Sequence, residues 1–209
     1  TPLYSSAASD VYKRQLINII SGLQGQDEGT IKLDRSFIEN TPSYKRSNRG
    51  IARTYQTSLR SSGLDVYQAI LACSSNQHNL EHRDNQTHAI LRNSRLTFKT
   101  GVMVGDLSTA DARELDLCMA IATEPKILLL DEPAAGLSSA EQQFLSTKIR
   151  QLAQSGISIL IVDHSMDFLL PVVDRLICLD QGSVVAEGTP AEVLADPKAL
   201  KLYFGNSRS

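Results

Sequence analysis

The sequence has little net charge, few cysteines and no long hydrophobic run. Its 21 Lys and Arg residues are nearly balanced by 23 Asp and Glu residues, so the net charge of −2 gives no electrostatic reason to expect a nucleic-acid partner. The longest apolar stretches, Ile127–Leu130 and Ile157–Val162, are far too short to cross a bilayer. Any membrane role must therefore come through a partner protein.

The three cysteines, Cys73, Cys118 and Cys178, lie far apart in the sequence and are odd in number. Both features argue against a disulfide framework and against a cysteine zinc site. We therefore expect buried, reduced thiols, as in a cytoplasmic protein of ordinary globular composition, with 42% hydrophobic and 21% charged residues.

The beginning of the chain has an unusual character. The sequence opens with Thr1, and its first methionine is Met103, which suggests an incomplete reading frame. Residues Thr1–Gln15 lack the apolar core and the cleavage site of a secretory signal. They resemble translated adapter sequence at the end of a gene fragment; the alternative is a genuine polar extension. We expect residues 1–15 to lie outside the fold and residues 16–209 to form the domain.

Helical and strand patterns alternate in the second half of the chain. The patterns predict helices over Asp111–Ala122 and Ser139–Gln154, each followed by one of the two apolar stretches as a buried strand. Two wholly apolar strands joined by a helical crossover indicate a parallel sheet that is covered on both faces. The sequence therefore predicts an α/β fold.

The remaining segments give shorter signals. Polar residues dominate between Thr57 and Ala110, where we expect a small helical subdomain. Its helices are predicted over Val66–Cys73 and Thr87–Leu96. Further expected elements are a helix end at Leu16–Gly22, strands at Gly29–Asp34 and Ile51–Gln56, a hairpin of Leu176–Leu179 with Ser183–Ala186, and capped helices after Ser138 and Thr189.

Two adjacent acids, Asp131 and Glu132, follow the first buried strand. In parallel α/β sheets, ligands bind at the carboxyl ends of the strands, and adjacent acids there need a cation. Nucleotide with Mg²⁺ meets that need if Asp131 holds the metal through water and Glu132 orients or deprotonates the attacking water. The alternative is an ordinary solvated turn at the end of a strand.

Two further polar residues also stand at strand ends. His164 follows the second buried strand, where it could hydrogen-bond a γ-phosphate, and Gln56 follows an earlier strand, where its amide could reach the metal or the water. Each alone is compatible with a surface or loop residue. Together with Asp131 and Glu132 they predict one phosphate site.

These residues stand in the order typical of ABC ATPases. Gln56, Leu107–Arg113, Ile127–Pro133, Ala134–Leu137 and His164 resemble the Q-loop, signature, Walker B, D-loop and H-loop of that family. The phrases GIARTYQ, ILLLDEPAAGLSSAE, IVDHSMD and AEGTPAEVLADP look closely like the branched-chain amino acid importer group. The AAGL phrase is also typical of the related lipopolysaccharide exporters. The resemblance covers about residues 16–205.

The resemblance implies a P-loop-type ABC ATPase core with ATP and Mg²⁺ as cofactors. Two subunits would pair head-to-tail around two ATP molecules, with Ser108 of each facing the nucleotide of the other. Such a dimer would drive transmembrane permease subunits from the inner face of the plasma membrane. Asp131 and Gln56 would hold the metal, and Glu132 and His164 would act in hydrolysis.

The chain departs from the family at the phosphate-binding loop G-x-x-x-x-G-K-[ST]. The aligned segment Ala7–Arg14 lacks both glycines; Lys13 falls in the lysine register, and Arg14 stands in place of the hydroxyl residue that binds Mg²⁺. The signature is degenerate too, because Ala110 and Asp111 replace the usual glycine and glutamine. We expect the chain as written to hydrolyse ATP poorly.

The sequence leaves two other classes of protein open. His78, Glu81 and His82 match the H-x-x-E-H pattern of zinc peptidases, although the flanking residues are polar on all sides. An ABC-type ATPase of DNA repair or translation is the other class, but the interval from Gln56 to Leu107 is too short for a long coiled coil. Import of branched-chain amino acids or a related small polar solute is the leading expectation, with lipopolysaccharide export as the alternative.

Overall fold

The computed structural model of the chain describes residues 7–54, 63–74 and 79–204. The helices are α1 (Ala7–Ser21), α2 (Ser43–Asn48), α3 (Val66–Cys73), α4 (Leu80–Arg92), α5 (Thr109–Ala122), α6 (Ser139–Gln154), α7 (Met166–Leu169), α8 (Pro190–Ala195) and α9 (Pro197–Phe204), with a 3-10 turn at Val104–Asp106. The strands are β1 (Lys32–Leu33), β2 (Ser36–Phe37), β3 (Ile51–Arg53), β4 (Ile127–Asp131), β5 (Ser158–Val162), β6 (Leu176–Asp180) and β7 (Ser183–Gly188).

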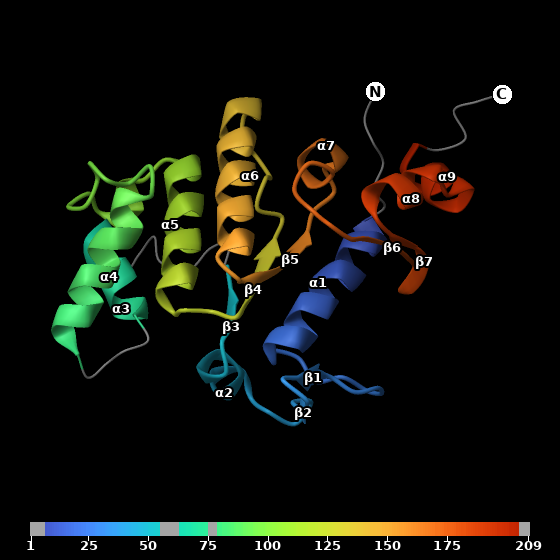
Figure 1. The fold of residues 1–209 in the computed structure, drawn as a ribbon, viewed down its shortest axis with the longest axis horizontal. Coiled ribbons are helices and arrows are strands. Elements are labelled where there is room, and N and C mark those ends of the chain that lie inside the picture. The colour runs from blue at the N-terminus through green and yellow to red at the C-terminus, as the bar shows by residue number, and fades with distance from the viewer. Residues whose placement is uncertain (1–6, 55–62, 75–78, 205–209) are drawn as a thin grey trace.

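A parallel three-stranded sheet in the order β3-β4-β5 lies at the centre of the molecule (Figure 1). Helices α5 and α6 lie on one side of it and α1 on the other, while α3 and α4 stand at one end of the molecule and β6, β7, α8 and α9 at the other. The expected α/β fold is confirmed. The central strand β4 is buried as predicted, but β5 is half-buried because it forms an edge of the sheet among the described residues.

Local signals predicted several elements to the residue. Helices α3 and α6 have the expected bounds. Helix α6 begins with the expected capping box: the Ser138 hydroxyl accepts a hydrogen bond from the Glu141 N–H, and the Glu141 carboxylate accepts one from the Ser138 N–H. Thr189 and Glu192 form the same box before α8, and β6 and β7 form the expected antiparallel hairpin.

Several helices differ from the prediction. Helix α5 begins at Thr109 rather than Asp111, and α4 ends at Arg92 rather than Leu96.

Helix α4 begins at Leu80 rather than Thr87, because the Asn79 side chain caps it by accepting a hydrogen bond from the His82 N–H at 3.0 Å. Its first two turns are polar, so no hydrophobic pattern marks them. Helix α9 follows α8 after a break of one residue, at Asp196, and was not predicted.

The N-terminal segment is helical. Residues 7–15, which we expected to lie outside the fold, form the first half of α1, and the helix continues without a break to Ser21 and the left-handed Gly22. Its apolar side is anchored by the wholly buried Ile17. The division of the chain at residue 15 stays a prediction, but the secondary structure runs across it.

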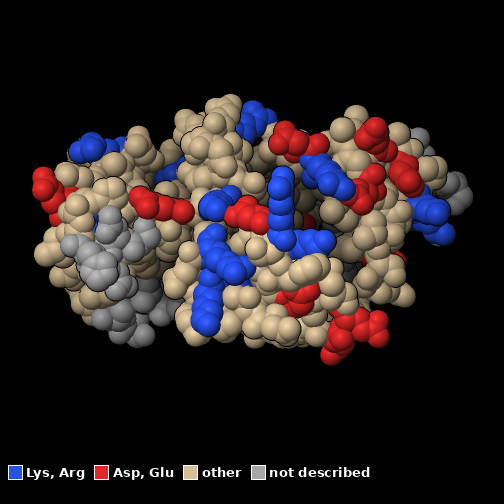
Figure 2. Space-filling model, turned by 60° about the horizontal axis from the view of Figure 1, so that its bottom comes forward, with Lys and Arg blue, Asp and Glu red and all other residues tan. Residues whose placement is uncertain are grey.

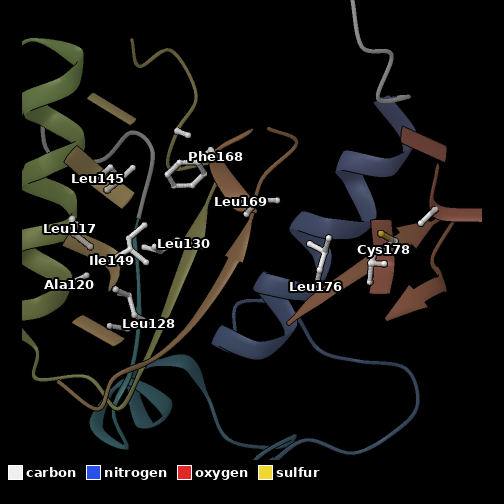
Figure 3. Close-up of a cluster of buried hydrophobic side chains, with 14 of the residues drawn as sticks. Leu117, Ala120, Leu128, Leu130, Leu145, Ile149, Phe168, Leu169, Leu176 and Cys178 are labelled. Atoms are coloured by element: carbon white, nitrogen blue, oxygen red, sulfur yellow. The ribbon is translucent and has the colours of Figure 1, made fainter. Parts of the chain in front are cut away.

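The core is divided into three clusters. The largest joins β4 to α5, α6 and α7 and extends to β6. Figure 3 shows Leu128 and Leu130 of β4 beside Ile149 of α6, and Leu176 of β6 nearer the other end of the cluster. A second cluster joins α3 and α4 to one face of α5, and a third packs α1 against β3 and β4. The predicted helical subdomain of about residues 57–110 therefore shares α5 with the rest of the fold, and its limits stay a prediction.

One buried ion pair crosses between α5 and α6. The Lys148 ammonium donates a short hydrogen bond to the Glu114 carboxylate, and both side chains are at most one-tenth exposed. The Cys118 sulfur lies 3.9 Å from the same ammonium. Burial raises the pKa of the Cys118 thiol to about 12, so this cysteine stays protonated as a core residue, as expected for a reduced thiol.

A second charge cluster closes the start of α5. The Ser108 hydroxyl and the Lys99 ammonium both donate to Asp111 Oδ2, at 2.6 and 2.5 Å. Burial alone would raise the pKa of the Asp111 carboxyl, but the hydrogen bonds from Lys99 and Ser108 outweigh it and hold that pKa below its ordinary value. Asp111, which replaces the usual glutamine of the signature, adds a negative charge there, and a cation of the same chain neutralises it.

Lys148→Met should lower the free energy of unfolding by about 3–5 kcal/mol, because it leaves the Glu114 carboxylate buried without its cation. The double variant Glu114→Leu, Lys148→Met removes both charges and should recover most of that loss. Urea unfolding measures both. Arg175→Met, at the largely exposed Arg175–Glu187 pair, is the control and should cost about 1 kcal/mol or less. A double variant as unstable as the single one would contradict the explanation.

Asp111→Asn should lower the free energy of unfolding by about 1–2 kcal/mol at neutral pH, since charge-assisted hydrogen bonds are lost. The folded pKa of Asp111 lies below the unfolded value of 3.8. The stabilisation is therefore complete above about that pH and disappears as the pH falls through the folded pKa. Thermal unfolding of both proteins between pH 2 and 7 should show curves that converge only at the acid end; a constant difference would contradict the ion pair.

Candidate functional site

The carboxyl edge of the parallel sheet carries the predicted site residues. Asp131 lies opposite Val162 in the register of β4 and β5, and the Glu132 N–H donates to the Val162 carbonyl at 2.7 Å. His164 follows two residues after Val162, so the structure brings Asp131, Glu132 and His164 to one edge. Gln56 lies outside the described residues, although Thr54, just after β3, donates its N–H to Leu129 on the same side.

The acids sit in different surroundings. The Asp131 side chain is 5% exposed and the Glu132 side chain 23%. Glu132 adopts a left-handed backbone with a φ of 46°, which costs a non-glycine residue roughly 1–2 kcal/mol and must be held by its surroundings. One holder is Arg113 of α5, whose Nη1 donates to the Glu132 carbonyl at 3.2 Å. The signature motif contains Arg113, but sequence reasoning assigned it no contact.

Two guanidinium groups neutralise these acids. Arg53, at the end of β3, is 10% exposed, and its Nη2 lies 3.1 Å from Asp131 Oδ2. Arg14 of α1 lies 3.6 Å from Asp131 through its Nε and 3.8 Å from Glu132 through its Nη2. Asn18, one helical turn after Arg14, accepts a hydrogen bond from Arg53 at 2.5 Å. One face of α1 thus supplies both contacts.

Neither arginine contact was predicted. Arg14 was recognised only as a departure from the phosphate-binding loop, and Arg53 only as a letter of the GIARTYQ phrase. The helical spacing of Arg14, Ile17, Asn18 and Ser21 was the signal available, because the i, i+3, i+4, i+7 pattern places all four on one face. The helix-end assignment began at Leu16, so the pattern was not followed back to Arg14.

As they are arranged, these residues do not fit Mg²⁺ or a nucleotide phosphate. Mg²⁺ needs oxygen ligands, and here a guanidinium lies against both carboxylates at the position where the family has a hydroxyl. The segment containing Lys13 is a continuous helix, so the backbone N–H groups of its interior bond within the helix and cannot surround a phosphate. The Mg²⁺ roles of Asp131 and Gln56 and the ATP contact of Lys13 stay predictions from sequence.

The predicted histidine is exposed and has a buried acid beside it. The His164 ring is 55% exposed, and its Nδ1 lies 3.9 Å from Asp163 Oδ1. The Asp163 carboxylate, 1% exposed, accepts from the Ala134 N–H at 3.2 Å and from the Ser165 N–H at 2.9 Å. Asp163 therefore ties the end of β5 to the segment after Glu132. Sequence analysis assigned Asp163 no role; it appears there only within the IVDHSMD phrase.

The remaining candidates have mainly local partners. Ser108 is the N-cap of α5, and its hydroxyl accepts a hydrogen bond from the Asp111 N–H at 3.2 Å. Its contact with a nucleotide of a second subunit stays a prediction. His82 lies 3.4 Å from Glu124, Glu81 is exposed, and His78 lies outside the described residues. Within the part of the chain described, no group of three His, Cys, Asp or Glu residues could hold a metal.

A membrane span requires a helix of sufficient length and apolarity. None of the helices among residues 7–54, 63–74 and 79–204 is long and apolar enough to span a bilayer. The expectation that any membrane role comes through a partner stays a prediction.

The chain is similar to known transport ATPases. The sequence model of the ABC transporter family matches residues 13–135. A probable ABC transporter ATP-binding protein of Azorhizobium caulinodans is 30% identical over 92% of this chain and 69% of its own length. The lipopolysaccharide export system ATP-binding protein LptB of Escherichia coli is 30% identical over 90% and 78%. The branched-chain amino acid transport ATP-binding protein BraF of Pseudomonas aeruginosa is 26% identical over 93% and 83%.

Solved structures agree with the sequence relatives. A nucleotide-free ATP-binding cassette of an ABC transporter is 26% identical, covers 91% of this chain and 82% of its own, and has a TM-score of 0.79. The ADP conformation of such a cassette is 28% identical, covers 93% and 84%, and has the same TM-score of 0.79. The chain therefore belongs to the ABC transporter family, as one of the ATPases that couple ATP hydrolysis to transport.

Proposed function

We propose that the chain is the ATP-binding and ATP-hydrolysing subunit of an importer for branched-chain amino acids or a related small polar solute. One observation carries the catalytic part of the proposal. The adjacent acids Asp131 and Glu132 end the buried central strand, and His164 stands at the same edge. This arrangement supports a phosphate-processing site, since ligands of parallel α/β sheets bind at that edge.

The proposed reaction requires an intact phosphate-binding loop in place of the segment that carries Arg14. In it Glu132 would orient the attacking water and accept its proton, and the His164 ring would hydrogen-bond the γ-phosphate. Asp131, whose side chain is nearly buried, places a negative charge at a fixed position at the end of β4. Gln56, which follows β3 in the sequence, would contact the same water, and Ser108 of a second subunit would complete the site. The exposure of Glu132 and His164 supports these roles, because both must be reached by a ligand from solvent.

The partners proposed are a second ATP-binding subunit and transmembrane permease subunits, on the inner face of the plasma membrane. Nucleic acid is not proposed. Figure 2 supports that choice for one face, where Lys and Arg side chains gather next to acidic side chains instead of covering the face with one sign of charge. Independently of that view, the exposed Lys126 and Asp34 side chains form an ion pair, with Nζ and Oδ2 2.8 Å apart.

Lipopolysaccharide export is the second candidate, favoured by the 30% identity to LptB. Import is supported by BraF and by LivG of Salmonella typhimurium, at 26% and 27% identity. The permease that co-purifies with the chain discriminates between them. A permease encoded beside a periplasmic binding protein supports import, and one that acts with outer-membrane export components supports the alternative.

Restoring the phosphate-binding loop should restore activity. The change replaces Thr1–Gln15 with an intact strand and a G-x-x-x-x-G-K-T-T loop. The loop would return several charge-assisted hydrogen bonds of about 1.5–3 kcal/mol each, so three of them should tighten ATP binding about a thousandfold or more. Calorimetry measures the binding, and phosphate release measures the turnover.

In the restored chain, Glu132→Gln should lower turnover about a hundredfold or more while ATP still binds, because the general base is removed. Glu124→Gln is the matched control. Glu124 also has a left-handed backbone, but it precedes β4 at the opposite edge of the sheet, so its loss should leave turnover unchanged. A restored chain that cannot bind ATP, or a Glu132→Gln variant with full turnover, would overturn the assignment of the ATPase site to the carboxyl edge of the sheet.

A further inference from the structure

We propose that Arg14 is a built-in cation at the carboxylate pair Asp131–Glu132, and that it keeps divalent metal ions out of this site until its side chain withdraws. The inference rests on the proposed function in one respect: it identifies what controls metal access to the proposed ATPase site. Its evidence is the disagreement between the residues present and the ligand set that Mg²⁺ requires.

Arg14 is placed to bridge both acids. Its Nε lies 3.6 Å from Asp131 Oδ2 and its Nη2 lies 3.8 Å from Glu132 Oε1, so a single guanidinium spans the pair. A metal held by Asp131, directly or through water, would need the space and the negative charge that this guanidinium takes. At separations under 4 Å one positive charge strongly disfavours a second cation, even in a partly solvated site.

The helix that carries Arg14 is firmly held. Ile17 is fully buried, and the buried Arg46 closes the far end of α1 by donating to the Ile19 carbonyl at 2.6 Å and the Ile20 carbonyl at 3.0 Å. Gly22 lies so close to Arg46 that a Cβ there would meet the Arg46 Nε at 2.9 Å. The backbone of Arg14 is thus held in register with the sheet edge through contacts that do not involve Arg14.

The Arg14 side chain itself is movable, in contrast to that of Arg53. Arg14 is 50% exposed, so its guanidinium can leave the acids without opening the core. Arg53 is 10% exposed and is held by Asn18 as well as Asp131, so it remains as a permanent structural partner. Withdrawal of Arg14 would remove one positive charge from the two carboxylates while Arg53 stays at Asp131, and this makes the site more favourable for a divalent cation.

The test is a titration of the full chain, without nucleotide, with Mn²⁺ monitored by electron paramagnetic resonance. Arg14→Gln keeps a long helix-forming side chain but removes the charge, and it should bind Mn²⁺ at least about tenfold more tightly than the unaltered chain. Arg14→Lys retains the charge and should bind no better than the unaltered chain. Arg175→Gln, at an exposed Arg–carboxylate pair in the β6–β7 hairpin region, is the matched control and should change nothing.

A second substitution locates the gained site. Adding Asp131→Asn to Arg14→Gln should abolish the gain, because it removes the acid that would bind the metal. Equal Mn²⁺ affinity of the unaltered chain and Arg14→Gln overturns the proposal, and so does a gain that survives Asp131→Asn. Circular dichroism shows that each variant is folded, and Arg14→Ala replaces Arg14→Gln if the latter is not.

This outcome is independent of the test of the proposed function. The loop-restored chain lacks Arg14 altogether, so its turnover reports on Glu132 and not on Arg14. A gain of Mn²⁺ binding without turnover in the restored chain would uphold the Arg14 inference and reject the ATPase site. Turnover in the restored chain without any gain in Arg14→Gln would do the reverse.

Discussion

The site depends on one electrostatic constraint: two acids at the end of a buried strand must be neutralised. Asp131 is almost wholly buried, and an unpaired charge in such a place would destabilise the fold. Here the positive charge comes from the protein itself, through Arg53 from β3 and Arg14 from α1. The packing of α1 against β3 and β4 and the register of β4 with β5 are what make these contacts possible.

Features that depend on residues close together in the sequence were predicted well. The apolar run of β4, the capping boxes of Ser138 and Thr189 and the turn between β6 and β7 are local features, and each appears where it was expected. The shared edge of Asp131 and His164 was also predictable, because parallel strands joined by a helical crossover end on the same side. The roles of these residues stay predictions, since a chemical role requires a ligand.

Contacts between distant segments could not be predicted. Arg14 and Asp131 are far apart in sequence, and their approach depends on where α1 packs and on its rotation. The start of α4 was missed for a different reason: its polar first turns are held by the Asn79 cap and not by burial. The buried acid Asp163 had no role assigned from sequence, and only the structure shows that its two oxygens accept hydrogen bonds from the Ala134 and Ser165 N–H groups.

The departures from the family pattern share a physical logic. Asp111, in the signature, adds a negative charge, and Lys99 of the same chain meets it. Arg14, in the phosphate-loop register, adds a positive charge, and Asp131 and Glu132 meet it. In both places an internal ion pair stands where the family motif serves a ligand. The consequences for a ligand differ. A metal ion must displace Arg14 before it can use the two acids, so the free energy of that pair stabilises the ligand-free fold and is lost from metal binding. Lys99 instead neutralises an acid whose charge would repel phosphate, and a phosphate ligand need not break that pair.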